Sequence, residues 1–432
     1  GASGSADGRK RAGENGTRDV LAEPGFYDNL IQKYATQQDS EQVNMKKLFQ
    51  LGKTVVERPG VVLENAQFLQ KELPKRLAKR LLDLQFLPYI VVINPNIKRV
   101  YEAYYNGFQK LRQFPPVADN ATNVEFTQLL KRLVDEHGPL VESLAAGLRE
   151  CKSKPVIGDQ LKLDSFLNSM LTSRISRRVL AEQHIALQQK RQNFVGIVST
   201  ALDLKEAVEF AFIRAQQICI QTYGISPEIQ LRGDTKAVIS YIPTHLDYML
   251  FELMKNALRA TVERAIVSKK GVFNTKGTGK KSKSREEGGF MPPVVIQICQ
   301  AKSDVTIKIC DQGGGISEKA INKIWNYGYT TVDDAELMSS MPEKVKNSFD
   351  LTGSAPSPAG GAMGGAGMLP HSGAHGNSQS KMAGLGFGLP LSRLHARYFG
   401  GDLKLINVDG YGVDVYLTIK CMDDPESISD LR

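Results

Sequence analysis

The chain has 432 residues, of which 41% are hydrophobic, and this length and composition suit two or three domains with cores of their own. It contains no apolar run that approaches the ~18 residues of a membrane span, so we exclude membrane insertion. More than half of the net charge of +9 comes from residues 268–290, where seven Lys or Arg stand against two Glu, so we expect a solvated basic loop and no nucleic-acid binding.

The first part of the chain predicts a disordered segment followed by a helical bundle. Residues 1–25 are rich in Gly, Ala and charge and show no periodicity, so we expect them to be disordered. Apolar residues recur at helical spacing between residues 26 and 192, most clearly in Asn65–Leu87 and Thr127–Leu148. Prolines fall between such segments, and several long helices with short connections predict a bundle.

The second part, residues 193–422, predicts an α+β sandwich. Short segments of alternating, β-branched residues predict strands, and the first two predict a hairpin. These segments are Val294–Gln300, Val305–Cys310, Leu403–Asn407 and Val413–Lys420. Helical patterns at Leu246–Val267 and Leu389–Phe399 lie among them, so we expect helices on one face of a mixed sheet.

Two insertions and a tail are predicted within and after this part. Residues 268–290 form the basic insertion, and residues 423–432 form the tail. In Leu351–Ala383, 22 of 33 residues are Gly, Ala, Ser or Pro, so the segment cannot bury a core. It precedes a glycine-rich motif, which makes residues 328–386 a candidate mobile lid over a ligand. A plain disordered insertion is the alternative.

A polar stripe is predicted on the helix at Leu246–Val267. Its members stand at positions i, i+3, i+4 and i+7, so they project from one face: Glu252, Lys255, Asn256 and Arg259. Mg²⁺ prefers hard oxygen ligands such as an amide carbonyl, and cations neutralise phosphate oxygens. The stripe therefore suits a magnesium–phosphate group. Taken alone, a solvated face with an internal Glu–Arg pair explains it as well.

Two glycine-rich motifs add to this stripe. Asp311 follows a predicted strand and precedes Gly313–Gly315, a turn in which the backbone approaches a neighbour closely and the carboxylate can accept from an exocyclic amine such as that of adenine. Residues Gly384–Leu389 precede a predicted helix, whose N-terminal N–H groups can hold phosphates. Each motif alone is also compatible with an ordinary glycine-rich turn.

In this order, the three motifs resemble those of the GHKL ATPases, a superfamily that includes gyrase, heat-shock ATPases and histidine kinases. Within it the chain most resembles the mitochondrial 2-oxo acid dehydrogenase kinases, from about Met45 to Lys420. The segments that carry this resemblance are Phe68–Arg76, Phe108–Leu111, Thr172–Arg178, Asp247–Ala260 and Gly384–Pro390.

The resemblance implies an ATP-dependent protein serine kinase of the mitochondrial matrix. Such kinases phosphorylate the E1 α-subunit of a 2-oxo acid dehydrogenase complex and thereby inactivate it. The resemblance further implies Mg²⁺ as cofactor, the lipoyl domain of the E2 subunit as partner and a homodimer. The bundle at residues 26–192 is then the docking and regulatory domain, and residues 193–422 are the kinase domain.

The resemblance also implies roles for individual residues. Glu252 is the general base, and Asn256 is the Mg²⁺ ligand. Lys255 and Arg259 stabilise charge on the phosphates, and Glu252, Asn256 and Arg259 also contact ATP. The remaining ATP-binding residues read the adenine, contact the nucleotide or wrap the phosphates: Asp311, Gly313, Gly315, Thr330, Thr331, Gly384, Leu385, Gly386, Phe387, Gly388 and Leu389.

The chain combines features of two branches of the family. Kinases of pyruvate dehydrogenase usually carry His one helical turn before the base, where this chain has Tyr248, as the branched-chain kinase does. Met249–Leu253 is similar to the pyruvate branch, whereas Phe108–Pro116 is similar to the branched-chain one. We favour the pyruvate dehydrogenase complex as substrate, with the branched-chain complex as the alternative.

Three further hypotheses remain open from the sequence. A non-catalytic ATP-binding scaffold is one alternative, although the presence of both Glu252 and Asn256 argues against it. A histidine kinase would use His184, but its neighbours favour a structural histidine. Met45, Leu48 and Phe49 are either part of a lipoyl-domain pocket or ordinary core residues.

Overall fold

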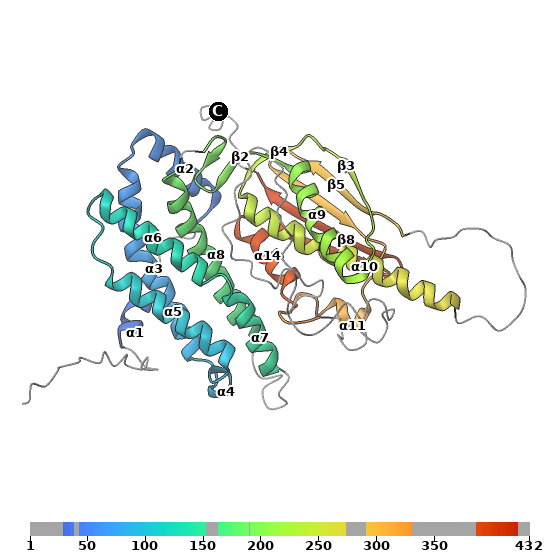
Figure 1. Cartoon of the computed structure of the whole chain (residues 1–432), viewed down its shortest axis with the longest axis horizontal. Coiled ribbons are helices and arrows are strands. Elements are labelled where there is room, and N and C mark those ends of the chain that lie inside the picture. Colours follow the sequence, from blue (N-terminus) through green and yellow to red (C-terminus); the bar gives the residue numbers. More distant parts are fainter. Residues whose placement is uncertain are drawn as a thin grey trace, which may run out of the picture.

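The computed structural model describes residues 29–38, 43–152, 163–189, 191–273, 291–330 and 386–421. A bundle of helices lies beside an α/β part, and helix α8 runs along the bundle where the two parts meet (Figure 1). The predicted disordered segment, the tail, Leu351–Ala383 and most of the basic insertion lie outside the described residues.

The bundle is built from helices that pack through α3, which contacts α1, α5, α6 and α8. Its helices are α1 (Asn29–Ala35), α2 (Met45–Glu57), α3 (Val61–Gln85), α4 (Tyr89–Val92), α5 (Pro95–Gln113), α6 (Asn120–Glu136), α7 (Leu140–Lys152) and α8 (Leu163–Leu187). Local sequence sets several of their ends. Asp119 and Thr122 form a capping box at α6, and Asn94 caps α5 ahead of Pro95.

The helical apolar pattern of Thr127–Leu148 is divided between two helices. Helix α6 ends at Glu136, and α7 begins at Leu140. Pro139 explains the break, because a proline disfavours helical dihedrals at the residue before it and has no N–H for the helical ladder. The apolar stripe continues across the break because both helices face the same core.

The α/β part contains two sheets, and the predicted α+β class is confirmed. The larger sheet has the order β3-β5-β6-β8-β7, with a parallel β3–β5 pair and antiparallel pairs elsewhere. Its strands are β3 (Ile229–Gly233), β5 (Val294–Gln300), β6 (Asp304–Cys310), β7 (Asp402–Val408) and β8 (Gly412–Lys420). The second sheet, which the sequence analysis missed, is β1 (Phe194–Val195), β2 (Val198–Asp203) and β4 (Val238–Tyr241).

Helices cover one face of the larger sheet (Figure 1). They are α9 (Leu204–Tyr223), α10 (Pro243–Phe273) and α14 (Gly388–Tyr398), while the short α11 (Glu318–Ile321) lies near one end of the sheet. Strand β6 buries alternate residues, Val305, Ile307 and Ile309, toward these helices, as its β-branched alternation predicts. The sheet thus fixes the loops at its ends relative to α10.

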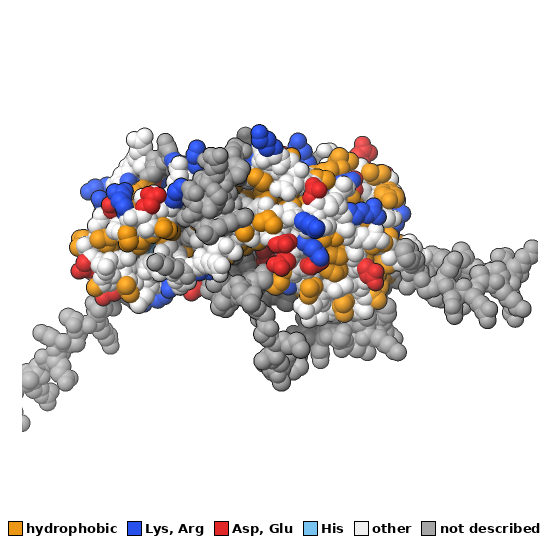
Figure 2. Space-filling model, turned by 90° about the horizontal axis from the view of Figure 1, so that it is seen from above, with side chains coloured by type: hydrophobic (Ala, Val, Ile, Leu, Met, Phe, Trp, Pro, Cys, Tyr) orange, Lys and Arg blue, Asp and Glu red, His pale blue; other side chains and the backbone are white. Residues whose placement is uncertain are grey.

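On the face shown in Figure 2, cationic, anionic and apolar side chains are interspersed over the described residues. Within the described part of the chain, no helix combines the length and apolarity that a membrane span requires.

Burial describes the bundle residues that the sequence singled out. His184 is fully buried, and its ring nitrogens lie 3.1 Å from Asn65 Nδ2 and 3.2 Å from Thr127 Oγ1, so it is a structural histidine. Burial lowers its pKa to about 4, so the ring is neutral at pH 7. Met45, Leu48 and Phe49 are buried, and the first two belong to the core of the bundle.

Candidate nucleotide site

Helix α10 carries the predicted polar stripe at the centre of the candidate site. Glu252, Asn256 and Ala260 follow one another at i, i+4 and i+8, so they lie along one line of the helix surface. At 1.5 Å per residue, this line is about 12 Å long. Glu252 and Asn256 are partly exposed, so their polar atoms are available to a ligand.

Both glycine-rich motifs contact this line, one at each end. A Cβ at Gly388 would overlap Oε2 of Glu252, and a Cβ at Gly313 would overlap the side chain of Ala260. Only glycine allows such close approaches of the backbone. The two loops therefore converge on α10 two turns apart, with Asn256 halfway between them.

The cations of the stripe are each held by a carboxylate. Lys255 Nζ lies 2.9 Å from Glu252 Oε1, and the lysine is buried. Arg259 donates instead to Glu263 Oε1 at 2.9 Å, and the hydroxyl of Tyr223 donates to the same oxygen at 2.9 Å. Lys255 thus stands beside Glu252, whereas Arg259 is tied to the next turn of α10.

Asp311 occupies the other end of the site. Two backbone amides donate to its Oδ1, that of Gly313 at 2.8 Å and that of Val413 at 3.3 Å, so Oδ2 is the oxygen that can accept from a ligand. Burial raises the pKa of this carboxyl to about 6, and the nearby Asp414 adds to the shift, while the two amides oppose it. The group is therefore largely ionised at pH 7 and protonated below pH 6.

The pKa of Asp311 predicts that adenine-nucleotide affinity falls as the pH drops through 6. A proton on the carboxyl competes with the exocyclic amine that it would accept, so affinity should fall by up to about tenfold per pH unit below the pKa. Calorimetric titrations with ATP between pH 5.5 and 8 measure this dependence. Inosine triphosphate has the same phosphates without the amine and gives the baseline. Identical pH profiles for the two nucleotides would contradict the role of Asp311. In Asp311→Asn, the pH dependence of the affinity should be the same for ATP and inosine triphosphate.

Residues that the sequence analysis missed hold the Asp311 loop in place. Asn407 on β7 accepts from the amide of Ile316 and donates to its carbonyl, both at 2.7 Å. The carbonyl of Tyr411 accepts from the amide of Gly314 at 3.0 Å and from Arg264 at 2.9 Å. These contacts join segments about 90 to 150 residues apart, so no local sequence pattern announces them.

The third motif is described only in part. Gly386, Phe387, Gly388 and Leu389 lie at the start of α14, whereas Gly384, Leu385 and Thr331 lie outside the described residues. The amide of Gly328 donates to the carbonyl of Gly386 at 3.1 Å, which places the segment before Thr330 beside this motif. The N-terminus of α14 therefore opens at Glu252, where its dipole and free N–H groups favour an anion.

Tyr248 lies one turn before Glu252 and is half-buried. Burial raises the pKa of this phenol well above its ordinary value, and the Glu252 carboxylate raises it further, so it stays neutral. Its ring packs against His395 of α14 at 5.2 Å between centroids, and His395 packs in turn against His245 at 4.7 Å. These rings fix the packing of α14 on α10 behind the site.

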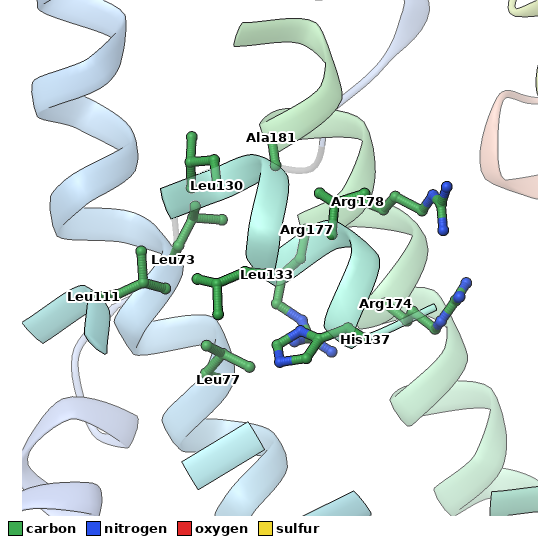
Figure 3. Close-up of a pocket in the computed structure, with 11 residues that line it drawn as sticks. Leu73, Leu77, Leu111, Leu130, Leu133, His137, Arg174, Arg177, Arg178 and Ala181 are labelled. Carbon is green, nitrogen blue, oxygen red and sulfur yellow. The ribbon is translucent and has the colours of Figure 1, made fainter. Parts of the chain in front are cut away.

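The bundle contains a separate cavity of about 50 Å³ (Figure 3). Its lining is mainly apolar, with three arginines of α8 at its border: Leu73, Leu77, Leu111, Leu130, Leu133, Val134, His137, Arg174, Arg177, Arg178 and Ala181. Burial lowers the pKa of His137 to about 3, so the ring is neutral, and Arg178 pairs with Glu182 at 2.6 Å. This cavity was not predicted from the sequence. Its signal was the cluster of three arginines on α8.

Comparison with known proteins finds relatives among mitochondrial kinases. Residues 42–199 match a family described as mitochondrial branched-chain alpha-ketoacid dehydrogenase kinase. A mitochondrial pyruvate dehydrogenase (acetyl-transferring) kinase of Arabidopsis thaliana is 33% identical over 89% of this chain and 91% of its own length. The corresponding kinase of Schizosaccharomyces pombe is 30% identical over 87% of this chain and 92% of its own length. Pyruvate dehydrogenase (acetyl-transferring) kinase isozyme 1 of Mus musculus is 30% identical over 84% of this chain and 74% of its own length.

Proposed function

Because the chain belongs to the family of mitochondrial 2-oxo acid dehydrogenase kinases, we propose that it phosphorylates serine on the E1 α-subunit of the pyruvate dehydrogenase complex and inactivates that complex. The observation that carries this proposal is the convergence of both glycine-rich loops on α10, at Glu252 and at Ala260. This arrangement suits a nucleotide that extends along the helix, with its adenine at Asp311 and its phosphates at Glu252.

The proposed chemistry assigns one role to each group. Phosphoryl transfer depends mainly on in-line positioning and electrostatic stabilisation. Glu252 accepts the proton of the substrate serine, and Lys255, at 2.9 Å, holds its carboxylate in place. The N–H groups at the start of α14 and the cations Lys255 and Arg259 stabilise phosphate charge. Asp311 Oδ2 accepts from the adenine amine.

The donor set around Asn256 fits Mg²⁺. Among the described residues no three His, Cys, Asp or Glu side chains form a metal-binding group. Mg²⁺ usually keeps several waters and takes one or two protein ligands together with substrate phosphates. The partly exposed amide of Asn256, one turn after Glu252, would supply such a ligand. When bound, the ion neutralises phosphate charge.

Two observations bear on the choice of substrate. The family that matches residues 42–199 is described as branched-chain alpha-ketoacid dehydrogenase kinase. The relatives that match most of the chain are named pyruvate dehydrogenase kinases. The breadth of the second match favours the pyruvate dehydrogenase complex, and the branched-chain complex is the second candidate. The relatives are named as mitochondrial proteins. We assign this protein to the mitochondrion as well, and within it to the matrix.

We further propose a homodimer and docking to the lipoyl domain of E2. Strand β7 lies at an edge of the larger sheet, and Ile406, Val408 and the neighbouring Tyr411 are exposed there. An exposed apolar edge favours association with a second chain. The bundle at residues 26–192 is then free to serve as the docking domain.

Transfer of labelled phosphate from Mg-ATP to pyruvate and branched-chain E1, side by side, tests the function. We expect label on pyruvate E1 that survives an acid wash, since phosphoserine is stable to acid and phosphohistidine is not. Label on branched-chain E1 alone would transfer the proposal to that complex. Binding of ATP without label on either E1 would favour the non-catalytic scaffold.

A further inference from the structure

Tyr327 joins the helical bundle to the loop that precedes α14. The residue follows α11 in the segment that leads toward Thr330, and its side chain is buried. Its hydroxyl donates to Oδ1 of Asn168 on α8 at 2.7 Å. The two residues are 159 positions apart, so this bond connects the two parts of the molecule.

The ring of Tyr327 contacts the glycine-rich motif. It packs against Phe387 with 5.2 Å between ring centroids and 48° between ring planes. The next residue, Gly328, donates its amide to the carbonyl of Gly386 at 3.1 Å. Two consecutive residues therefore hold Gly386 and Phe387, and the residue after these is Gly388, which touches Glu252.

Helix α8 carries a second acceptor in the turn before Asn168. Asp164 precedes Asn168 by one turn, so both lie on one face of α8. Burial raises the pKa of Tyr327, and the charge of Asp164 raises it further. Asp164 Oδ1 is buried without a hydrogen-bond partner among the described residues. The first two turns of α8 thus carry two side-chain oxygens that can accept a hydrogen bond, one from Asn168 and one from Asp164.

We propose that Tyr327 is a positioning residue for the nucleotide loop and that its bond to Asn168 makes nucleotide affinity depend on helix α8. The inference rests on the proposed function, because it takes Gly386–Leu389 as part of the nucleotide site. The bond to α8 sets the place of the Tyr327 ring, and the ring sets the place of Phe387. Linkage is reciprocal, so a bound nucleotide orders the N-terminal half of α8 in return.

Tyr327→Phe removes one hydroxyl and leaves the ring, and Asn168→Ala removes its partner. Asn168 is an exposed residue, so its replacement leaves the core intact. A net hydrogen-bond contribution predicts a roughly threefold to tenfold weaker Kd for a non-hydrolysable ATP analogue in either variant. The double variant should be no weaker than the weaker single one, since both remove the same bond. Calorimetry with Mg²⁺ measures these values.

Tyr101→Phe is the matched control. Its hydroxyl accepts from Nε2 of Gln85 at 3.0 Å, so this variant also removes a hydroxyl that is bonded to an amide side chain, but within the bundle. It should lower thermal stability to a similar extent and leave the Kd unchanged. An equal Kd in Tyr327→Phe and the unmodified protein would overturn the inference while the proposed function stands. Failure of the unmodified protein to bind the analogue would overturn both.

Hydrogen exchange adds a readout that a purely structural role would not change. The analogue should slow amide exchange in residues 163–173 of α8 in the unmodified protein and in Tyr101→Phe. It should slow exchange there much less in Tyr327→Phe at saturating nucleotide. Equal protection of α8 in all three proteins would overturn the inference.

Discussion

Replacement of Glu252 by Gln is expected to lower phosphoryl transfer by roughly two to four orders of magnitude, the usual contribution of a general base. Glutamine has nearly the same shape, and its carbonyl still accepts from Lys255, which lies 2.9 Å from Glu252 Oε1. It cannot take up the proton of the substrate serine. Nucleotide affinity should therefore remain close to that of the unmodified protein, so the loss appears in kcat.

Transfer of labelled phosphate to E1 and calorimetry with the ATP analogue measure the two quantities separately. Glu209→Gln is the matched control, because Glu209 is an exposed carboxylate on α9 that pairs with Lys205 at 3.8 Å, away from the site. That control should transfer phosphate at the unmodified rate. Full activity in Glu252→Gln would remove Glu252 as the base, whereas loss of nucleotide binding would give it a role in binding.

The elements that local sequence determines were predicted best. Strands β5, β6 and β8 lie within one residue of their predicted bounds, because alternation of β-branched residues matches a sheet with one buried face. Helix α10 is longer than predicted at both ends, since the apolar pattern weakens before the helix does. The second sheet was missed because β1 has two residues and β4 has four, too few for a pattern.

The site was predicted as a set of residues but not as an arrangement. Helical spacing placed Glu252 and Asn256 on one face, and α10 confirms that spacing. Helical spacing did not show which carboxylate each cation pairs with. Glu252 lies three positions from Lys255, and Glu263 lies four positions from Arg259, and both separations allow an ion pair. Nor could it predict that Gly388 meets Glu252, since that contact depends on the packing of α14 against α10.

The same limit explains why Tyr327 and Asn407 were missed. Both act through partners distant in sequence, Asn168 and Ile316, and neither belongs to a short motif. Glycine-rich motifs announce where a backbone must approach a neighbour closely, but they do not identify the neighbour. The residues that hold such loops become visible only with the tertiary structure.

Replacement of Asn256 by Ala is expected to weaken binding of the magnesium–nucleotide complex by roughly 10- to 100-fold or more, since even changes behind a metal ligand have effects of that size. Asn256 lies one turn after Glu252 and one turn before Ala260, so its amide faces the middle of the proposed nucleotide path. Its loss should affect the part of the affinity that depends on Mg²⁺. Binding of nucleotide in the presence of a chelator should therefore change little.

Paired titrations of the ATP analogue, with Mg²⁺ and with chelator, separate these contributions. Asn96→Ala serves as control, because Asn96 is an amide on α5 that donates to Glu150 at 3.1 Å, within the bundle. It should keep the Mg²⁺ dependence of the unmodified protein. Equal weakening of Asn256→Ala in both conditions would show that Asn256 contacts the nucleotide itself. An unchanged Kd with Mg²⁺ would exclude Asn256 as the ligand and leave the Glu252 carboxylate as the nearest oxygen donor on the same face of α10.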